Sequence, residues 1–387
     1  MGLDSLQTPS VELYDRASAH RIPFPDTPEG HQVAKLLLPW LENSVTHYVA
    51  NVTTSLYVLR IDDMLVPVTV NNKEYENSYV CSPFTHYVTY AREELYKLKS
   101  SFLESILGWM LDGMGLLLKA GHMNQTVHIN NGLFSTNLYP TRVPRNLIEG
   151  LRLLRTKFPE HTIIFRSLTP ILNGAWIHVL RQEQFRFIPS RQVYLFAPPS
   201  GKARWLIKRD RRLLIKNKYE VVPPERLTLT DVPRLRLLYN MVYLEKHSRC
   251  NPWFTEAFFD QALLSGTLQI YALRNELTGT LDAVLGFYVK DGVMTTPVFG
   301  YDTSLPREVG LYRMLSAVLI DISEQFGWQL HESSGAAEFK RNRGAIPHIE
   351  YSAVFDADLP WIRRAGWTVL DRLLNRIGVP LMRKWKL

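Results

Sequence analysis

The spacing of apolar positions changes along the chain from short alternating runs to helical periods. Near the start, the runs at 56–61 (LYVLRI) and 64–70 (MLVPVTV) are divided by polar turns, a pattern typical of β-strands. Beyond residue 90 the pattern predicts helices over 93–120, 144–157 and 175–183, separated by strands over 125–129, 162–165 and 192–196. The first half is therefore expected to mix helices and strands.

A dense group of helix- and strand-breaking residues, APPSG at 197–201, divides the chain. After it the pattern predicts helices over 231–246, 255–264 and 311–326 and strands over 268–274, 283–289, 293–299, 329–332 and 350–355. This order predicts an α+β fold with a central, largely antiparallel sheet flanked by helices. The first half repeats a weaker version of the order, so we expect two tandem modules.

The length of 387 residues also favours two domains. We assign 1–30 to a flexible N-terminal tail, 31–199 to an N-terminal module, 200–356 to a C-terminal module, and 357–387 to a basic amphipathic C-terminal helix. The N-terminus shows no basic segment followed by an apolar run, and the two cysteines exclude a disulfide framework. A cytoplasmic location is the simplest expectation.

The net charge of +8 is concentrated in two segments. Residues 202–218 carry a net +7 and residues 361–387 a net +6, so the remainder is mildly acidic. Two basic segments on an acidic body indicate anionic ligands or surfaces, the alternative being solvated helix faces. No His and Cys spacing typical of a metal site is present.

The helix over 311–326 begins at a glycine, in the sequence Arg307-Glu308-Val309-Gly310-Leu311-Tyr312. Amides at a helix start have no intrahelical acceptor, so they can bind one anion such as a phosphate. Following the next predicted strand, a turn with the sequence SSG at 333–335 leads to FKRNRG at 339–344.

These stretches resemble the GNAT acyltransferase superfamily, and in particular its two-module Fem-type branch. The superfamily's donor loop has Arg or Gln, two residues, Gly, one residue, then Gly or Ala; here Arg307 and Gly310 match and Tyr312 departs from the pattern. The second half is also similar to the Fem-type branch in its Gly, spacer, Phe-Lys, basic, Gly signature. The resemblance covers about residues 200–356.

The resemblance implies an N-acyltransferase in which an amine directly attacks a thioester. The donor, acyl-CoA or the phosphopantetheine of an acyl carrier protein, would bind at Arg307, Gly310, Leu311 and Tyr312. Backbone amides at Val298 and Gly300 would polarise the carbonyl, between two strands that separate beside the donor loop.

From the residues themselves, we expect Glu332 to act as the base, because partial desolvation raises the pKa of a carboxylate; a structural ion pair with Lys340 is the alternative. Lys340 in the basic turn is a candidate to hold a phosphate or stabilise negative charge. Tyr351 and Tyr301 are candidates to return a proton to the leaving group, the alternative being packing.

Three alternatives stay open at this stage. The donor can instead be an aminoacyl-tRNA, as in Fem-type ligases, because the basic segments would contact its phosphates. The protein can also be a non-catalytic binding protein, because Tyr312 departs from the donor-loop pattern. The C-terminal helix is a candidate for peripheral membrane contact, unless its apolar side packs on the body. The sequence does not reveal the acceptor amine or the oligomeric state.

Overall fold

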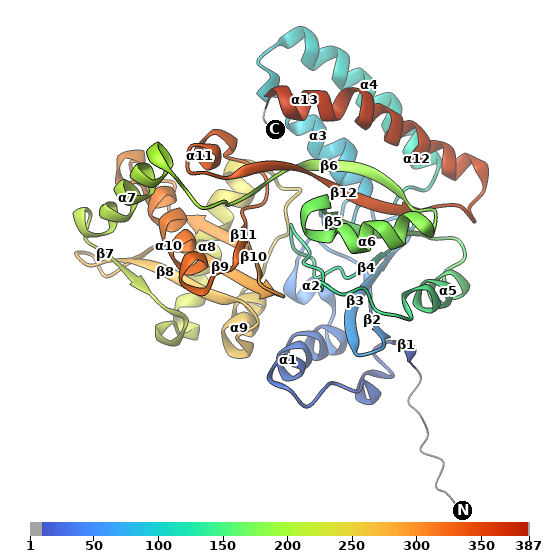
Figure 1. The fold of residues 1–387 in the computed structure, drawn as a ribbon, viewed down its shortest axis with the longest axis horizontal. Coiled ribbons are helices and arrows are strands. Elements are labelled where there is room, and N and C mark those ends of the chain that lie inside the picture. The colour runs from blue at the N-terminus through green and yellow to red at the C-terminus, as the bar shows by residue number, and fades with distance from the viewer. Residues whose placement is uncertain (1–9, 386–387) are drawn as a thin grey trace, which may run out of the picture.

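The structure is a computed structural model, and it describes residues 10–385 (Figure 1). Its strands are β1 (Val11–Tyr14), β2 (Ser55–Ile61), β3 (Met64–Asn71), β4 (Thr126–Ile129), β5 (Thr162–Leu168), β6 (Arg186–Leu195), β7 (Tyr219–Val222), β8 (Gln269–Asn275), β9 (Leu281–Lys290), β10 (Val293–Tyr301), β11 (Gln329–His331) and β12 (Ile346–Phe355).

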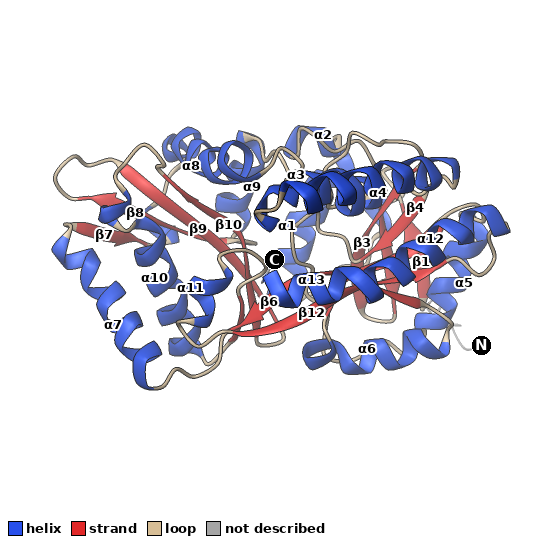
Figure 2. Cartoon of the chain, turned by 90° about the horizontal axis from the view of Figure 1, so that it is seen from above, coloured by secondary structure: helices blue, strands red, loops and turns tan. Residues whose placement is uncertain are grey.

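The helices cover both faces of the strands (Figures 1 and 2). They are α1 (Pro28–Glu42), α2 (Val45–Tyr48), α3 (Tyr90–Glu93), α4 (Ser101–Ala120), α5 (Leu147–Lys157), α6 (Pro170–Gln182), α7 (Gly201–Lys216), α8 (Val232–Asn240), α9 (Glu256–Ser265), α10 (Leu311–Phe326), α11 (Ala337–Arg341), α12 (Trp361–Leu373) and α13 (Val379–Trp385).

The twelve strands form one continuous sheet in the order β1-β2-β3-β4-β5-β12-β6-β11-β10-β9-β8-β7. The β4–β5 and β10–β11 pairs are parallel, and the other pairs are antiparallel. The predicted α+β class, with a largely antiparallel sheet flanked by helices, is confirmed. Each half contributes a strand-helix-strand unit of the same order, β4-α5-β5 and β10-α10-β11.

The two halves are joined through their last strands. β12, from the C-terminal half, lies between β5 and β6, while β6, from the N-terminal half, pairs with β11. The predicted boundary at residues 199 and 200 falls in the connection between β6 and α7, but the sheet runs across it. The division of the chain into separate modules therefore stays a prediction.

Four large apolar clusters fix the helices on the sheet. In the N-terminal half, α5 and α6 pack on one face of the strands, and α4 and α12 pack on the other around Leu118 and Trp367. In the C-terminal half, α7 and α10 cover one face and α8 and α9 the opposite face. The elements that carry the predicted donor loop are thus held by buried side chains on both sides.

One expectation for the N-terminal region is wrong. Part of the predicted flexible tail is ordered, because β1 pairs with β2 over Val11–Tyr14 and α1 begins at Pro28; residues 1–9 lie outside the described residues. Thr27 caps α1 by accepting a hydrogen bond from the Gly30 amide.

Candidate functional site

The parallel strands β10 and β11 separate after a short overlap. They pair from Val293 with Gln329 to Thr295 with His331, and β10 then continues to Tyr301 along β9 alone. β11 turns instead toward β6, where the Glu332 amide donates to the carbonyl of Tyr194 at 2.9 Å. The predicted opening between these strands is present, and it begins beside Thr296 and Glu332.

Three buried polar atoms at this opening have no hydrogen-bond partner among the described residues. They are Oγ1 of Thr296, Nε2 of His331 and Oε2 of Glu332. An unsatisfied buried polar group costs about 1–3 kcal/mol, so folded proteins rarely leave several together. Unpartnered polar atoms on residues that border an opening between strands are typical of a site that a polar ligand completes.

Glu332 has the electrostatic character expected of a general base. Burial raises the pKa of its carboxyl group to about 7, although the charges of Lys340 and Arg343 act in the opposite direction. A base with a pKa near working pH combines a deprotonated population with useful proton affinity. Burial lowers the pKa of its neighbour His331 to about 3, so that imidazole is neutral, and its Nδ1 accepts from the Ser333 amide at 3.1 Å.

The start of α10 lies next to this opening and has the form predicted for an anion site. Gly310 is the N-cap residue and has φ 77°, and its carbonyl accepts from the Met314 amide at 2.9 Å. The amides of Leu311, Tyr312 and Arg313 precede the first intrahelical donor and have no intrahelical acceptor. The positive φ favours glycine, and a Cβ atom at residue 310 would lie 2.8 Å from Cδ1 of Leu213, so the Leu213 side chain would have to move.

A cavity of about 680 Å³ opens at this helix start. The four residues predicted to bind the donor, Arg307, Gly310, Leu311 and Tyr312, all line it. The opposite wall comes from the helical turn that follows α8 and from the end of β10, with Met241, Glu245, Lys246, Tyr301 and Asp302. The structure therefore brings the predicted donor-loop residues together around one space.

Tyr312 connects the cavity to the opening between the strands. Its ring packs against the rings of Phe299, Tyr301 and Phe339, with centroids 5.2, 6.2 and 4.7 Å apart. Burial raises the pKa of its hydroxyl, and the negative charge of nearby Glu332 acts in the same direction. The departure from the donor-loop pattern thus supplies an aromatic wall and leaves the cavity open.

The other predicted β10 residues contribute through the main chain. Val298 and Gly300 pair with Gly286 and Val284 of β9, after a register irregularity between Thr295 and Val298. A Cβ atom at residue 300 would lie 2.5 Å from the Leu238 carbonyl, so Gly300 lets α8 lie directly on the strand. Both residues lie in the part of β10 beyond its pairing with β11, and their proposed role toward the carbonyl stays a prediction.

Lys340 is bound to the main chain. Its ammonium group is buried and donates to the carbonyls of Glu332 at 2.5 Å and Ser334 at 2.8 Å, with Ser333 at 3.4 Å. Among the described residues no ion pair joins it to the Glu332 carboxylate. Because its three donors face carbonyl oxygens, Lys340 shapes the turn that positions Glu332, and this geometry does not favour the predicted phosphate-binding role.

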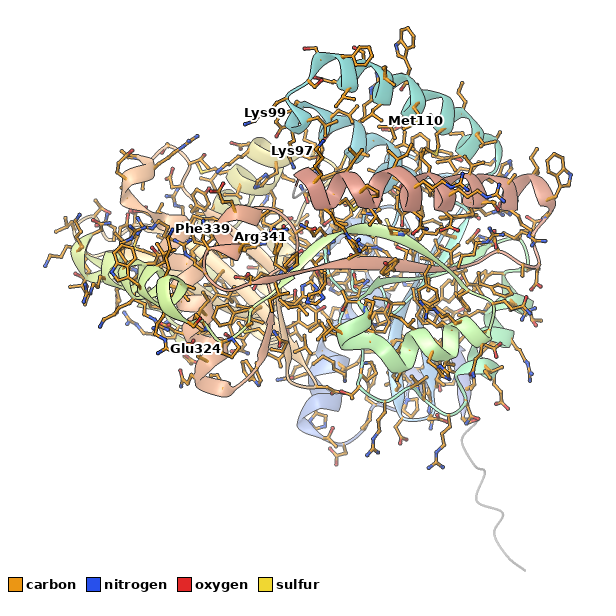
Figure 3. All side chains as sticks on the ribbon, turned by 45° about the horizontal axis from the view of Figure 1, so that its top comes forward. Lys97, Lys99, Met110, Glu324, Phe339 and Arg341 are labelled. Carbon is orange, nitrogen blue, oxygen red and sulfur yellow. The ribbon has the colours of Figure 1, made fainter. Side chains whose placement is uncertain are left out.

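Tyr351 lies apart from the donor cavity. It lines a second cavity of about 630 Å³ over β6 and β12, with Gln192, His348, Arg341 and Arg383 among the other lining residues. Figure 3 shows Phe339 and Arg341 close together on α11; Phe339 packs against Tyr312, whereas Arg341 belongs to the second cavity. The structure therefore does not group Tyr351 with Glu332, while Tyr301 lines the donor cavity.

Sequence reasoning missed a buried carboxylate that holds the site elements together. Asp210 of α7 accepts from Arg313 of α10 at 2.7 Å and from Arg343, after α11, at 2.6 Å. The only local signal was a single acid within the basic segment at 202–218.

Among residues 10–385, no group of three or more His, Cys, Asp or Glu side chains is arranged to hold a metal ion.

No protein-family model and no curated protein matches the chain. It is similar to the solved structure of L-PGS from Bacillus licheniformis, with 16% identity, a TM-score of 0.43, and 58% of this chain and 77% of that chain covered. It is similar to the structure of FemX, with 7% identity, a TM-score of 0.42, and coverage of 54% and 76%.

The chain is also similar to a tandem GNAT protein from the clavulanic acid biosynthesis pathway. That likeness has 9% identity and a TM-score of 0.36, and it covers 89% of this chain and 98% of that one. The similar structures thus include a tandem GNAT protein and FemX. At these identities and TM-scores the functional argument depends on the site itself.

Proposed function

We propose that this protein is an N-acyltransferase that moves an acyl group from a thioester of phosphopantetheine, carried by coenzyme A or by an acyl carrier protein, to an amine. The observation that carries the proposal is the cavity at the N-terminus of α10, next to the opening between β10 and β11 where Oε2 of Glu332 is buried without a hydrogen-bond partner among the described residues.

In this proposal the donor phosphates bind the free amides at Leu311–Arg313, with the exposed Arg307 beside them. The thioester then lies along the opening, with its carbonyl near the main chain at Val298 and Gly300. The amine nitrogen attacks the carbonyl carbon, the C–S bond breaks, and Glu332 takes the ammonium proton.

Tyr301 is the better placed of the two tyrosines to protonate the leaving sulfur. It lines the donor cavity, and its hydroxyl accepts a hydrogen bond from Lys246 Nζ at 2.6 Å, which leaves its own proton available for donation. The proton lost by Tyr301 is restored from solvent through the open cavity.

Thermal melts with coenzyme A, acetyl-CoA and phosphopantetheine test the donor site, because a ligand that binds the folded state raises Tm. We expect stabilisation of the wild type, weaker stabilisation of Arg307→Ala, and wild-type behaviour of Arg274→Ala, a strand arginine remote from the donor loop in sequence. Absence of any ligand-dependent shift in the wild type would support the non-catalytic alternative.

A macromolecular carrier is favoured by the surface of α7. This helix exposes Lys202, Lys208 and Arg209, and Arg209 stacks over the ring of the exposed Trp205. A basic row with an aromatic side chain suits an acidic carrier protein or the phosphates of an aminoacyl-tRNA.

Purification with and without ribonuclease, followed by binding to holo-acyl carrier protein across a salt series, distinguishes the two donors. Both occur in the cytoplasm, where we place the protein.

A further inference from the structure

Helix α4 presents a row of large apolar side chains to solvent. The exposed fractions are 72% for Phe102, 47% for Ile106, 80% for Trp109 and 74% for Leu116. Their spacing of four, three and seven residues places them along one side of a helix. Single exposed apolar residues are ordinary, but a continuous row on one helix indicates an interaction surface.

The core of the protein is formed by the opposite side of the same helix. Leu111, Met114 and Leu118 are buried in a cluster with Phe84 and Trp367. Of the described helices, α4 has the length and composition that would suffice to cross a membrane. Because one side is fixed to the sheet layer, its free side is available for contact in the plane of a surface.

The C-terminal segment lies beside α4 and supplies positive charge. α12 packs along α4, with Gly366 against Leu118, and Figures 1 and 2 show both helices in one layer over the sheet. Four arginines of the segment are exposed, and among residues 10–385 none forms a salt bridge: Arg364, Arg372, Arg376 and Arg383. Lys97, which pairs with Glu94, and Lys99 precede the first residue of α4 (Figure 3).

We infer that α4 and the α12–α13 segment form a docking surface for an anionic lipid bilayer. The apolar row of α4 enters the boundary between headgroups and acyl chains, and the arginines contact lipid phosphates. Of the two alternatives for the apolar side of the C-terminal helix, packing on the body holds for Trp367 and Leu370, which are buried, while Ile362 and Ile377 stay exposed. The C-terminal segment therefore contributes charge, and α4 contributes the inserting side chains.

Charge selects a lipid surface over a second copy of the chain. Acidic groups on this layer are few: Glu104 is exposed, Asp112 already pairs with Arg92, and Asp371 accepts a hydrogen bond from Asn375. In a two-fold contact between copies, one row of arginines would meet another row or an apolar row, with few carboxylates to balance it. An anionic bilayer supplies both an apolar interior and negative charge.

Flotation of the full chain with vesicles tests the surface independently of the proposed chemistry. We expect binding to vesicles of phosphatidylcholine and phosphatidylglycerol in equal parts, and little binding to phosphatidylcholine alone. The variant Phe102→Ser/Trp109→Ser/Leu116→Ser is expected to bind about tenfold more weakly, because it lacks three apolar side chains that would insert into the bilayer. Arg372→Glu/Arg376→Glu is expected to lose the preference for anionic lipid.

The matched control is Ile215→Ser/Leu277→Ser, which removes two side chains that are about as exposed but lie on other elements. It is expected to bind like the wild type. Failure of the wild type to float with anionic vesicles, or equal binding by the α4 variant, would overturn the inference. So would light scattering that shows a dimer which the α4 variant dissociates, because a second copy would then cover the surface.

Discussion

The two parallel strand pairs have the same topology but use their polar groups differently. β4 and β5 pair from Thr126 with Thr162 to Ile129 with Phe165, and β10 and β11 pair over a similarly short stretch. In each unit a helix connects the two parallel strands. Where its strands separate, the pair in the C-terminal half leaves three buried polar atoms without partners. The pair in the N-terminal half leaves one, Oγ of Ser167 on β5, and the neighbouring Arg166 is hydrogen-bonded to the protein.

Arg166 fills the position where β4 and β5 separate. Its Nη1 donates to the carbonyl of Val80 at 2.8 Å, to Oδ1 of Asn131 at 3.3 Å and to the carbonyl of Phe134 at 3.4 Å. The Tyr139 hydroxyl donates to the Arg166 carbonyl at 2.6 Å. These bonds close the space that remains open between β10 and β11.

The connecting helices differ in the same way. At the start of α5, Asp62 accepts from the Asn146 amide at 3.2 Å and from its side-chain amide at 2.6 Å, so a carboxylate of the protein already occupies this helix start. α10 begins at Gly310, which has no side chain to fill its start. One unit is therefore suited to support the fold and the other to receive an anion.

The largest effect is expected for Glu332→Gln, which removes the proposed base beside the β10–β11 pair. General base catalysis contributes about 100- to 10,000-fold, so kcat should fall by at least about 100-fold. Because the pKa of the Glu332 carboxyl group is raised to about 7, the wild-type rate should increase with pH through about 7 and then level off. The rate of the variant should not show this increase. Acyl transfer measured across pH checks both.

Glu338→Gln, on the exposed side of α11, is the control and should retain the wild-type rate and pH profile. An unchanged pH profile in Glu332→Gln would show that another group takes the proton.

Arg166→Met tests whether Arg166 stabilises the fold beside the β4–β5 pair. We expect a loss of about 3 kcal/mol in the free energy of unfolding, because three buried acceptors lose their donor. Donor binding per folded molecule should remain close to the wild type. Urea unfolding measures the loss, and Arg92→Met, at an exposed ion pair, should cost less than about 1 kcal/mol. Equal losses in the two variants would contradict the assigned difference between the pairs.

Gly310→Ala is expected to weaken donor binding and to lower stability by about 1–2 kcal/mol, because it strains a left-handed residue and crowds Leu213. Gly279→Ala is the matched control: its φ is 74°, and nothing lies within 4 Å of the added Cβ. Gly279→Ala therefore has the same backbone strain as Gly310→Ala but no crowded neighbour. Calorimetric titration with coenzyme A should therefore show weaker binding only for Gly310→Ala.

Thr296→Val has the smallest expected effect on stability, and its sign is informative. Removing an unpartnered buried hydroxyl should leave the free energy of unfolding unchanged or raise it by about 0.5–1 kcal/mol, while kcat/KM falls. Thr295→Val should instead destabilise by about 1 kcal/mol, because its hydroxyl donates to the His331 carbonyl at 3.3 Å. Destabilisation by Thr296→Val would mean that its hydroxyl has a structural role.

Local patterns predicted those parts of the site that are continuous in the chain. The loop from Arg307 to Tyr312 forms one wall of a cavity, and Glu332 lies where β10 and β11 separate, as predicted. Residue type alone makes Lys340 and Tyr351 candidates, but it does not give the direction of their side chains. The ammonium group of Lys340 folds back onto carbonyls of the preceding turn, and the strand register places Tyr351 in the second cavity.

The sequence by itself determined the strand-helix-strand units, the glycine start of α10 and the two basic segments, because periodicity, turn chemistry and charge are local properties. Only the tertiary structure decided that β12 crosses into the N-terminal half, that Asp210 joins α7 to α10, and that Arg166 closes one parallel pair while the other stays open. These outcomes depend on which side chains meet in the folded protein, and no local pattern specifies contacts between residues that are 86 or 103 positions apart.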